Sequence, residues 1–390
     1  MASRMVFPQE VVQQLGQKCP SQMNDDEFAE MLTITPLLEQ HKFFYVNTMY
    51  GGFTNYPITR GHILFEGRFE DLMSLTRVRF LRVFEKVRHI SRMASRELEV
   101  ERCGLACDGS RYISLIPLHG LAKEWKPVIF DEHEFHDTFP GYLTTKNGPV
   151  IDDATLVATQ SRIADVSRIK KPYDNHFDGD LYPLDQNVFA RLVRGEVPQW
   201  RIWEDNTHIA FLTPYGNTPG YTVLVPRKHL ASDIFGIDSH DYYDLVSAAY
   251  TVAHVLKKAF GVARCGMFFE GYEIDYAHVK LVPVHSDGSR FMHMGKPNSF
   301  YEKYPGYLTT QLGPMPFDDD ELVRMTNIFR DSLEADKTPT GSNSNANNSN
   351  RNSYGVRGNE DNSSGQSITA ATRLTQGFPG HGSNLKHEEA

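Results

Sequence analysis

The sequence predicts an α+β protein built from two tandem copies of one domain, each an antiparallel sheet with helices. The first observation is a repeat, because PGYLTTKNGP at 140–149 recurs as PGYLTTQLGP at 305–314. The second is that each repeat is preceded by the same order of strand and helix patterns. Sheets of this kind leave edges that must be covered or paired. We therefore expect the copies to pack edge to edge as a pseudo-dimer.

Two more blocks support the duplication. VERCGLACDG at 100–109 matches VARCGMFFEG at 262–271, and ISLIPLHG at 113–120 matches VKLVPVHS at 279–286. The blocks keep one order and a nearly constant spacing, as a duplicated domain does. The first copy is a few residues shorter between its two blocks.

The elements of the second copy follow from period and capping. Residues 221–225 alternate and end at Pro226, which predicts a strand. A helix begins at Asp238 or Ser239 and ends at Gly261. Its apolar face carries Leu245, Ala249, Val252, Leu256 and Ala259. Strands are predicted at 264–269 and 277–282.

The first copy shows the same order. A strand lies around 62–65, a helix carries Phe80, Phe84 and Val87, and two short strands follow. After each Gly-Pro pair comes an acidic run, at 152–153 and 318–320, which suits a helix N-terminus.

These patterns set the domain boundaries. The first copy spans 1–166, a connector spans 167–184 and the second copy spans 185–335. Residues 336–390 are rich in Asn, Ser and Gly and bury too little apolar surface to fold. We predict a disordered tail, either a solvated extension or a carrier of regulatory sites.

Composition excludes several classes of protein. The 390 residues are 40% hydrophobic, enough for two cores. A net charge of −9 argues against nucleic-acid binding. No apolar run is long enough to span a membrane, and the opening lacks a secretory signal. Four irregularly spaced cysteines give neither a disulfide framework nor a zinc motif. We expect a cytoplasmic protein, with the nucleus left open.

The candidate chemistry lies on the strand around His278. Alternation places Val279 and Leu281 toward the core and Tyr276, His278 and Lys280 on the opposite face. The positive charge of Lys280 favours the neutral, nucleophilic imidazole and stabilises charge on a phosphoryl oxygen. The alternative is a structural, hydrogen-bonded histidine.

Further motifs surround this strand in a fixed order. They are RGE at 194–196, WED at 203–205, AFLTP at 210–214, TPGY at 218–221, VPRKH at 225–229 and FEG at 269–271. Together with the His278 strand they resemble the histidine-triad (HIT) superfamily of hydrolases and nucleotidyltransferases. The branch they resemble most is that of diadenosine-tetraphosphate hydrolases. The resemblance covers about 190–315 and implies small α+β domains that dimerise or occur in tandem.

The resemblance implies a mechanism. The family signature has three histidines at alternate strand positions with a proline three residues after the last. Before Pro283 these positions hold Tyr276, His278 and Lys280. The resemblance makes His278 the nucleophile that attacks an α-phosphate and becomes a nucleotidyl-histidine. Lys280 fits the AHVKL pattern of that branch, whereas Tyr276 departs from the family and is left as a candidate proton donor.

The resemblance also implies substrate-binding residues. They are Phe211, Thr213, Pro214, Gly220, Tyr221, Lys228, His229, Glu270, Gly271 and His285. Phe211, Thr213 and Pro214 would flank the base and ribose. Lys228 and His229 either contact phosphates or lie on a solvated strand end. His285 either supports Lys280 from behind or fills a polar position.

The first copy differs at the decisive positions. Tyr112 and Ser114 stand where the second copy has His278 and Lys280, so we expect the first copy to be inactive. His119 persists opposite His285, which suggests a structural role in both copies.

The remaining histidine-rich motif is DEHEFHD at 131–137. It is a weak metal motif, and an acidic loop explains it better. We predict no metal and no cofactor.

The sequence therefore predicts a hydrolase or nucleotidyltransferase that cleaves nucleoside phosphate derivatives, such as dinucleoside polyphosphates, through His278. The alternative is a catalytically inactive nucleotide-binding or scaffold protein. A nucleotide is the expected partner, with no membrane and no nucleic acid.

Overall fold

The computed structural model describes residues 37, 39–178, 185–286, 298–314 and 317–337. The predicted tail therefore lies outside the described residues, except for 336–337, which end the last helix. Parts of the predicted connector and of the first copy lie outside them as well.

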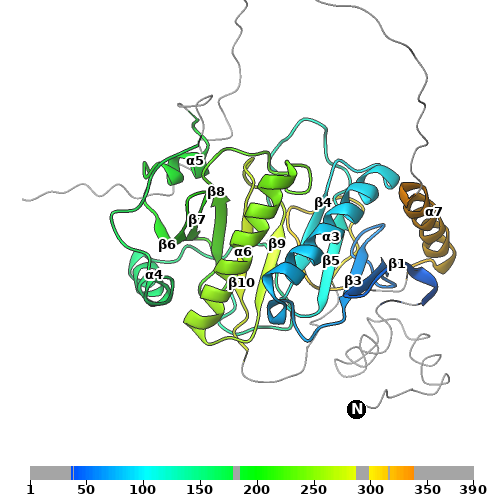
Figure 1. Ribbon diagram of the computed structural model, residues 1–390, viewed down its shortest axis with the longest axis horizontal. Helices are drawn as coiled ribbons and strands as arrows, with labels where there is room; N and C mark the ends of the chain where they lie inside the picture. The colour runs from blue at the N-terminus through cyan, green and yellow to red at the C-terminus, as the bar shows by residue number, and fades with distance from the viewer. Residues whose placement is uncertain (1–36, 38, 179–184, 287–297, 315–316, 338–390) are drawn as a thin grey trace, which may run out of the picture. The chain divides into compact units, whose positions relative to one another are not determined.

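The centre of the molecule is one ten-stranded antiparallel sheet (Figure 1). Its order is β1-β2-β3-β5-β4-β9-β10-β8-β7-β6. The strands of the first half are β1 Lys42–Val46, β2 Met49–Phe53, β3 Ile63–Gly67, β4 Cys103–Cys107 and β5 Tyr112–Pro117. Those of the second half are β6 Trp200–Glu204, β7 His208–Leu212, β8 Thr222–Pro226, β9 Cys265–Phe269 and β10 Val279–Pro283. From the outer edge inward, the first half has the order β1-β2-β3-β5-β4. The second half has the matching order β6-β7-β8-β10-β9.

The halves meet at β4 and β9. These strands pair antiparallel, with Leu105 opposite Phe269 and Cys107 opposite Met267. One continuous cluster of buried apolar residues runs beneath both halves. The two copies thus share a sheet and a core, and the inner edge of each is covered by the other.

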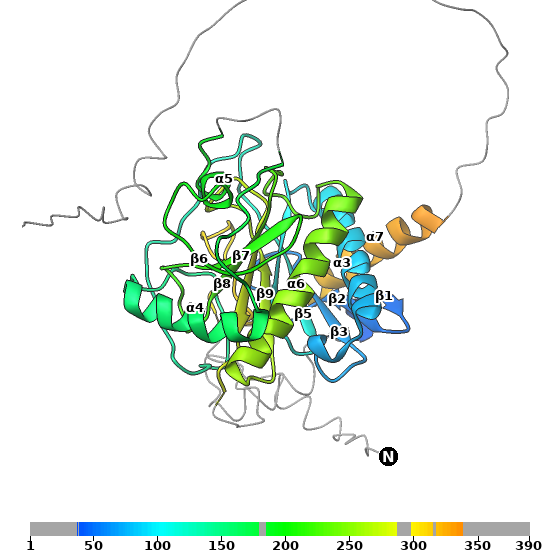
Figure 2. The same ribbon diagram turned by 60° about the vertical axis from the view of Figure 1, so that its left-hand side comes forward.

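Two long helices cover one face of the sheet, side by side in both views (Figures 1 and 2). In the first half α3 spans Arg77–Glu97, and the side chain of Thr76 caps its N-terminus. In the second half α6 spans Ser239–Phe260. Its N-cap is Asp238, and Gly261 ends it at φ 67, a left-handed conformation that glycine adopts without strain. The predicted start and stop of this helix are confirmed.

The helix that follows each repeat lies on the opposite half. Helix α4, Asp153–Ser167, follows the first repeat but packs on α6 and β6. Helix α7, Asp319–Lys337, follows the second repeat but packs on α3, β1 and β2 (Figure 1). Both predicted acidic helix starts are confirmed. Because the helices are exchanged, each half depends on the other for its outer covering.

Three short helical segments complete the described chain. They are η2 Glu39–His41, η3 Leu72–Ser74 and α5 Val188–Val193. Helix α5 lies on the face of the second half that α6 leaves open. None of the helices in the described part of the chain is both long and apolar enough to cross a membrane.

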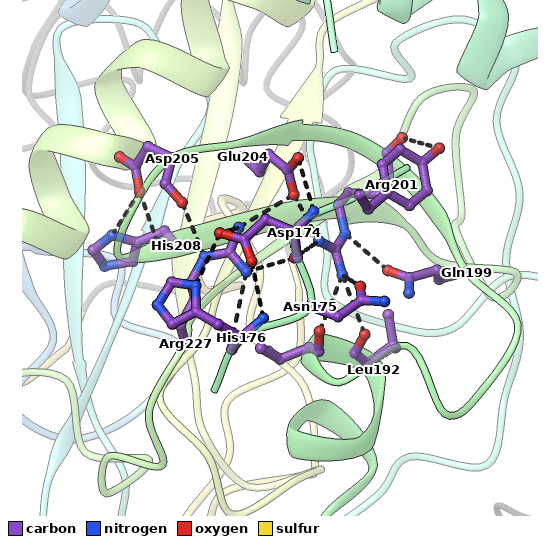
Figure 3. Close-up of polar contacts among 12 residues, drawn as sticks. Asp174, Asn175, His176, Leu192, Gln199, Arg201, Glu204, Asp205, His208 and Arg227 are labelled. Atoms are coloured by element: carbon purple, nitrogen blue, oxygen red, sulfur yellow. Dashed lines mark hydrogen bonds and ion pairs between the residues drawn. The ribbon is translucent and has the colours of Figure 1, made fainter. Parts of the chain in front are cut away.

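The described end of the connector is held against the second half by two buried arginines (Figure 3). Arg201 and Arg227 are both 0% exposed, and each pairs with Glu204. The carbonyl oxygen of Asp174 accepts from Nη1 of Arg201 at 2.5 Å and from Nη1 of Arg227 at 2.8 Å. The connector is therefore a fixed part of the second half up to this point.

Candidate functional site

The strand β10 divides its side chains as the alternation predicts. Val279 and Leu281 are fully buried in the shared core under α6. His278 and Lys280 are on the other face, 2% and 5% exposed. The candidate site is thus on the side of the sheet away from the long helices.

The ring of His278 is held in one orientation. Its Nδ1 lies 2.7 Å from the carbonyl oxygen of Tyr276. A carbonyl only accepts, so Nδ1 carries the proton and the lone pair lies on Nε2. Burial lowers the pKa of His278, and the nearby ammonium of Lys280 lowers it further. The result is a neutral imidazole whose basic nitrogen is Nε2, packed edge-on to Phe189 with 5.2 Å between ring centroids.

Lys280 bridges two carboxylates. Its Nζ lies 2.7 Å from Oε2 of Glu270 and 3.1 Å from Oε2 of Glu273. Burial alone would lower the pKa of Lys280, but the two carboxylates raise it. Glu270 also accepts hydrogen bonds from Thr145 Oγ1, at 2.8 Å, and from the Tyr304 hydroxyl. One positive and two negative charges therefore stand beside His278.

The first copy contributes to this site. Asn147 donates to Oε1 of Glu273 at 3.2 Å, and Thr145 to Glu270. Both belong to the repeated segment 140–149, which crosses to the second half and meets its counterpart at a bridge between Thr144 and Thr309. The repeat was visible in the sequence, but nothing in one chain's pattern showed that it crosses.

Tyr276 is engaged elsewhere. Its hydroxyl, expected as a candidate proton donor, donates instead to the carbonyl of Pro226 at 2.7 Å. The ring stacks on His229 with 4.7 Å between centroids. His229 in turn pairs with Asp185 Oδ2 at 2.6 Å. These contacts give both residues a packing role at the end of β8.

Of the residues expected around a base, Phe211 lies in an apolar cluster, whereas Thr213 and Pro214 do not belong to it. The cluster consists of Phe189, Ala190, Leu192, Val193, Ile209, Phe211, Val223, Val225 and Tyr276. Helix α5 supplies Phe189, which contacts both Phe211 and His278. The sequence analysis includes the RGE motif at 194–196 but not Phe189. The signal that could have identified Phe189 is an aromatic residue a few positions before that motif.

Thr213 and Pro214 lie at the end of β7. The hydroxyl of Thr213 accepts from the backbone of Tyr215 at 3.2 Å. The carbonyl of Pro214 accepts from Ile151 N at 2.9 Å, which is a contact with the crossing chain of the first copy.

Lys228 is not brought to the site. Its Nζ pairs with Asp241 at 2.6 Å, in the first turn of α6. Since α6 covers the opposite face of the sheet, this lysine is directed away from His278.

Two predicted glycines hold tight turns. Gly220 has φ +80, and an added Cβ would meet the Phe260 ring at 2.5 Å. Gly271 has φ +77, and an added Cβ would meet the carbonyl of Ser232 at 2.4 Å. Only glycine fits these positions without strain.

His285 and His119 make the same contact in the two halves. His285 Nε2 lies 2.8 Å from Pro219 O, and His119 Nε2 lies 2.9 Å from Arg60 O. Each histidine ties the end of its strand to the turn before the third strand of its half. His285 thus supports the turn, and no contact with Lys280 is found for it in the described part of the chain.

The matching place in the first half has different chemistry. Tyr112 and Ser114 occupy β5 beside a hollow that Asp108 and Ser110 also line. Asp108 is neutralised by Nη1 of Arg264 at 2.5 Å. The hollow carries no imidazole that could act as a nucleophile.

The histidine-rich segment 131–137 does not gather further ligands. Within the described ranges, no group of three His, Cys, Asp or Glu side chains is arranged to hold a metal ion.

Comparison with curated proteins places the chain beside HIT-like proteins. It is 23% identical over 125 residues to an uncharacterized HIT-like protein of Borreliella burgdorferi, covering 30% of this chain and 89% of that protein. A HIT-like protein of Methanocaldococcus jannaschii is 21% identical over 113 residues, covering 28% and 87%. One from Mesomycoplasma hyorhinis is 26% identical over 105 residues, covering 26% and 94%. No family model matches the chain.

The solved structures to which the chain is similar include HIT family proteins. A HIT family protein from Bacillus anthracis is 18% identical, with a TM-score of 0.29, covering 40% of this chain and 98% of that one. A HIT family hydrolase from Clostridium thermocellum is 19% identical, with a TM-score of 0.24, covering 27% and 97%. The curated relatives confirm the resemblance to the HIT superfamily, each over 26% to 30% of this chain.

Proposed function

From this resemblance to the HIT superfamily, we propose that the protein is a nucleotide hydrolase or nucleotidyltransferase whose nucleophile is His278. The observation that carries the proposal is the hydrogen bond from Nδ1 of His278 to the carbonyl of Tyr276. It fixes the tautomer that leaves Nε2 unprotonated, and burial keeps the ring neutral. An imidazole in this state is a ready nucleophile at neutral pH.

The proposed reaction has two steps. Nε2 of His278 attacks the α-phosphorus of a nucleoside phosphate derivative, and the bond from phosphorus to the leaving group breaks. Water, or another acceptor, then attacks the nucleotidyl-histidine, and the bond between phosphorus and Nε2 breaks to regenerate the imidazole. Dinucleoside polyphosphates and nucleoside phosphoramidates are the substrate classes we propose.

Because Lys280 is paired with Glu270 and Glu273, the charged groups beside His278 attract a phosphate less strongly than an unpaired lysine would. An ammonium has three N–H groups, and two of those on Lys280 point to Glu270 and Glu273. The third is the one we assign to a phosphoryl oxygen. Phe189 and Phe211 of the apolar cluster are proposed to hold the base, next to His278.

We further propose that the two halves are an active copy, 185–335, and an inactive copy, 1–166, fused as a pseudo-dimer. The continuous sheet, the repeated strand order and the exchanged helices support this division. In this arrangement the inactive copy still supplies Thr145 and Asn147 to the ion cluster.

The rival function is nucleotide binding without catalysis. It is favoured by the 2% exposure of His278 and by the double pairing of Lys280. A buried nucleophile must be uncovered before a phosphate reaches it. The two functions differ in one product, the covalent adduct.

The test incubates wild type, His278→Ala and the control His119→Phe with diadenosine tetraphosphate and adenosine phosphoramidate. The readouts are nucleotide release and a nucleotidyl-protein adduct detected by mass spectrometry after acid-free quenching. We expect release and adduct in wild type and in the control, and neither in His278→Ala. Micromolar nucleotide binding without release or adduct in wild type would establish the rival function instead.

A further inference from the structure

The hydroxyl of Tyr221 is a buried polar group for which the described part of the chain offers no hydrogen-bond partner. The side chain is 5% exposed and packs among apolar residues from both copies. Among the described residues, no group forms a hydrogen bond with its hydroxyl. Leaving a buried donor unsatisfied is destabilising, so such groups in folded proteins need an explanation.

The register places Tyr221 beside Lys280. Val223 is opposite Lys280 and Thr222 is opposite Leu281 in the pairing of β8 with β10. Tyr221 precedes β8 by one residue, so it lies on the same face as Val223 and Lys280, one diagonal step away. Burial raises the pKa of Tyr221, and the Lys280 ammonium opposes this rise while Glu270 and Glu273 reinforce it. The phenol therefore stands within the field of the ion cluster and stays protonated at neutral pH.

The first half has the same peculiarity at the equivalent position. His62 follows Gly61 as Tyr221 follows Gly220, and both glycines have positive φ, +76 and +80. His62 is 1% exposed, and its Nε2 has no hydrogen-bond partner among the described residues. Each half thus has a buried side chain with an unsatisfied polar atom at the equivalent position before its third strand.

Three other hydroxyls of the described site residues already have acceptors. Tyr276 donates to Pro226 O, while Thr145 and Tyr304 donate to Glu270. A phosphoryl group needs donors, and Lys280 has one N–H left after its two ion pairs.

We propose that the Tyr221 hydroxyl is a catalytic residue that donates a hydrogen bond to a phosphoryl oxygen of the substrate, beside the remaining N–H of Lys280. This rests on the proposed function. No bond to Tyr221 forms or breaks, because the phenol acts as a fixed donor toward charge that grows during attack by His278. The substrate supplies the partner that the described residues do not provide.

The test compares Tyr221→Phe with Tyr242→Phe, both measured against wild type. Tyr242 is a matched control because its hydroxyl is also buried but donates to Phe84 O at 2.8 Å, within the core. The substrate is diadenosine tetraphosphate, and the readouts are kcat, KM, the rate of adduct formation and the melting temperature. Tyr276→Phe is included because Tyr276 is the competing donor.

We expect Tyr221→Phe to lower kcat and the rate of adduct formation by about 10²- to 10³-fold. Its melting temperature should equal or exceed that of wild type, since no hydrogen bond is lost. Tyr242→Phe should lower the melting temperature and leave kcat unchanged.

Three outcomes overturn the inference. Full activity of Tyr221→Phe with active wild type removes Tyr221 alone and leaves the proposed function standing. A loss confined to Tyr276→Phe assigns the donor to Tyr276. Inactive wild type removes the proposed function, and the inference falls with it.

Discussion

Replacing Lys280 by methionine tests whether its ammonium holds the two carboxylates at the site. The variant keeps a long flexible side chain but leaves Glu270 and Glu273 without their cation. Glu270 has a side chain that is 3% exposed, while that of Glu273 is 20% exposed. The buried Glu270 should therefore carry most of the effect.

Removing one partner of a buried ion pair costs about 3–5 kcal/mol. Glu270 keeps its hydrogen bonds from Thr145 and Tyr304, and Glu273 is partly solvated, so the loss should be near the lower bound, about 3 kcal/mol at pH 7.5. In a marginally stable protein this is a large share of the free energy of unfolding.

The variant should also change the sign of the pH dependence. In wild type, burial opposes ionisation of Glu273, but Lys280 and Asn147 hold its pKa below the ordinary value, 4.5. That stability is present above the unfolded pKa and is lost as pH falls through the folded one. Without Lys280, burial outweighs the hydrogen bond from Asn147 and raises the folded pKa of Glu273 above the ordinary value, so stability should increase as pH falls from 7.5 to 5.5.

Urea denaturation at both pH values measures this directly, with Lys42→Met as the control, since Lys42 forms a pair with the exposed Glu39. Adding Glu273→Gln to Lys280→Met should restore part of the loss. A Lys280→Met variant within 1 kcal/mol of wild type at pH 7.5, or one that weakens on acidification as wild type does, would refute this account of the cluster.

Three more predictions follow from buried groups. Glu204→Gln should lower the free energy of unfolding in urea by about 3–5 kcal/mol and speed proteolysis of the connector, because two buried guanidiniums lose their carboxylate. Unchanged stability would contradict a structural role for the ion pairs drawn in Figure 3. His119→Phe and His285→Phe should each cost about 1 kcal/mol, since each loses the same kind of bond; a much larger loss for one would show that the two are not equivalent. Burial lowers the pKa of His62 to about 3, so below pH 6.5 the unfolded chain gains a proton that the folded chain lacks. His62→Phe should therefore flatten the fall in stability between pH 6.5 and pH 5 by up to about 1.4 kcal/mol per pH unit, and an unchanged slope would count against it.

The elements of the fold could be predicted where pattern and caps agree. Asp238 and Gly261 mark the two ends of α6, and alternation assigns Val279 and Leu281 to the core. The outer strands β1, β2, β6 and β7 were not predicted, and β7 is buried along its whole length, so its residues do not alternate. The other three strands have a further reason. Their runs are short and include two glycines in β2 and irregular register in β1 and β6, so their alternation is broken.

The site could be predicted only in part. The strand pattern located His278 and Lys280, because alternation is a local property of the chain. The partners of Lys280 are not local, since Thr145 comes from the other copy and Tyr304 from a later loop. Long-range ion pairs, such as that of Lys228 with Asp241, decide which lysines can bind a phosphate, and residue spacing does not predict these pairs.

The exchange of segments gives a physical reason for a first copy that is inactive, as we propose, to remain part of the molecule. Thr145 and Asn147 lie on the repeated segment 140–149 of the first copy, yet their hydrogen bonds are made to Glu270 and Glu273 of the second. Helix α4 of the first copy likewise covers β6 of the second, and α7 returns the contact. A first copy without a nucleophile would keep all these contacts, because they depend on the backbone course and on small polar side chains. In a fused pair of this kind, the two candidate sites can therefore diverge in chemistry while the sheet, the core and the ion cluster still require both halves.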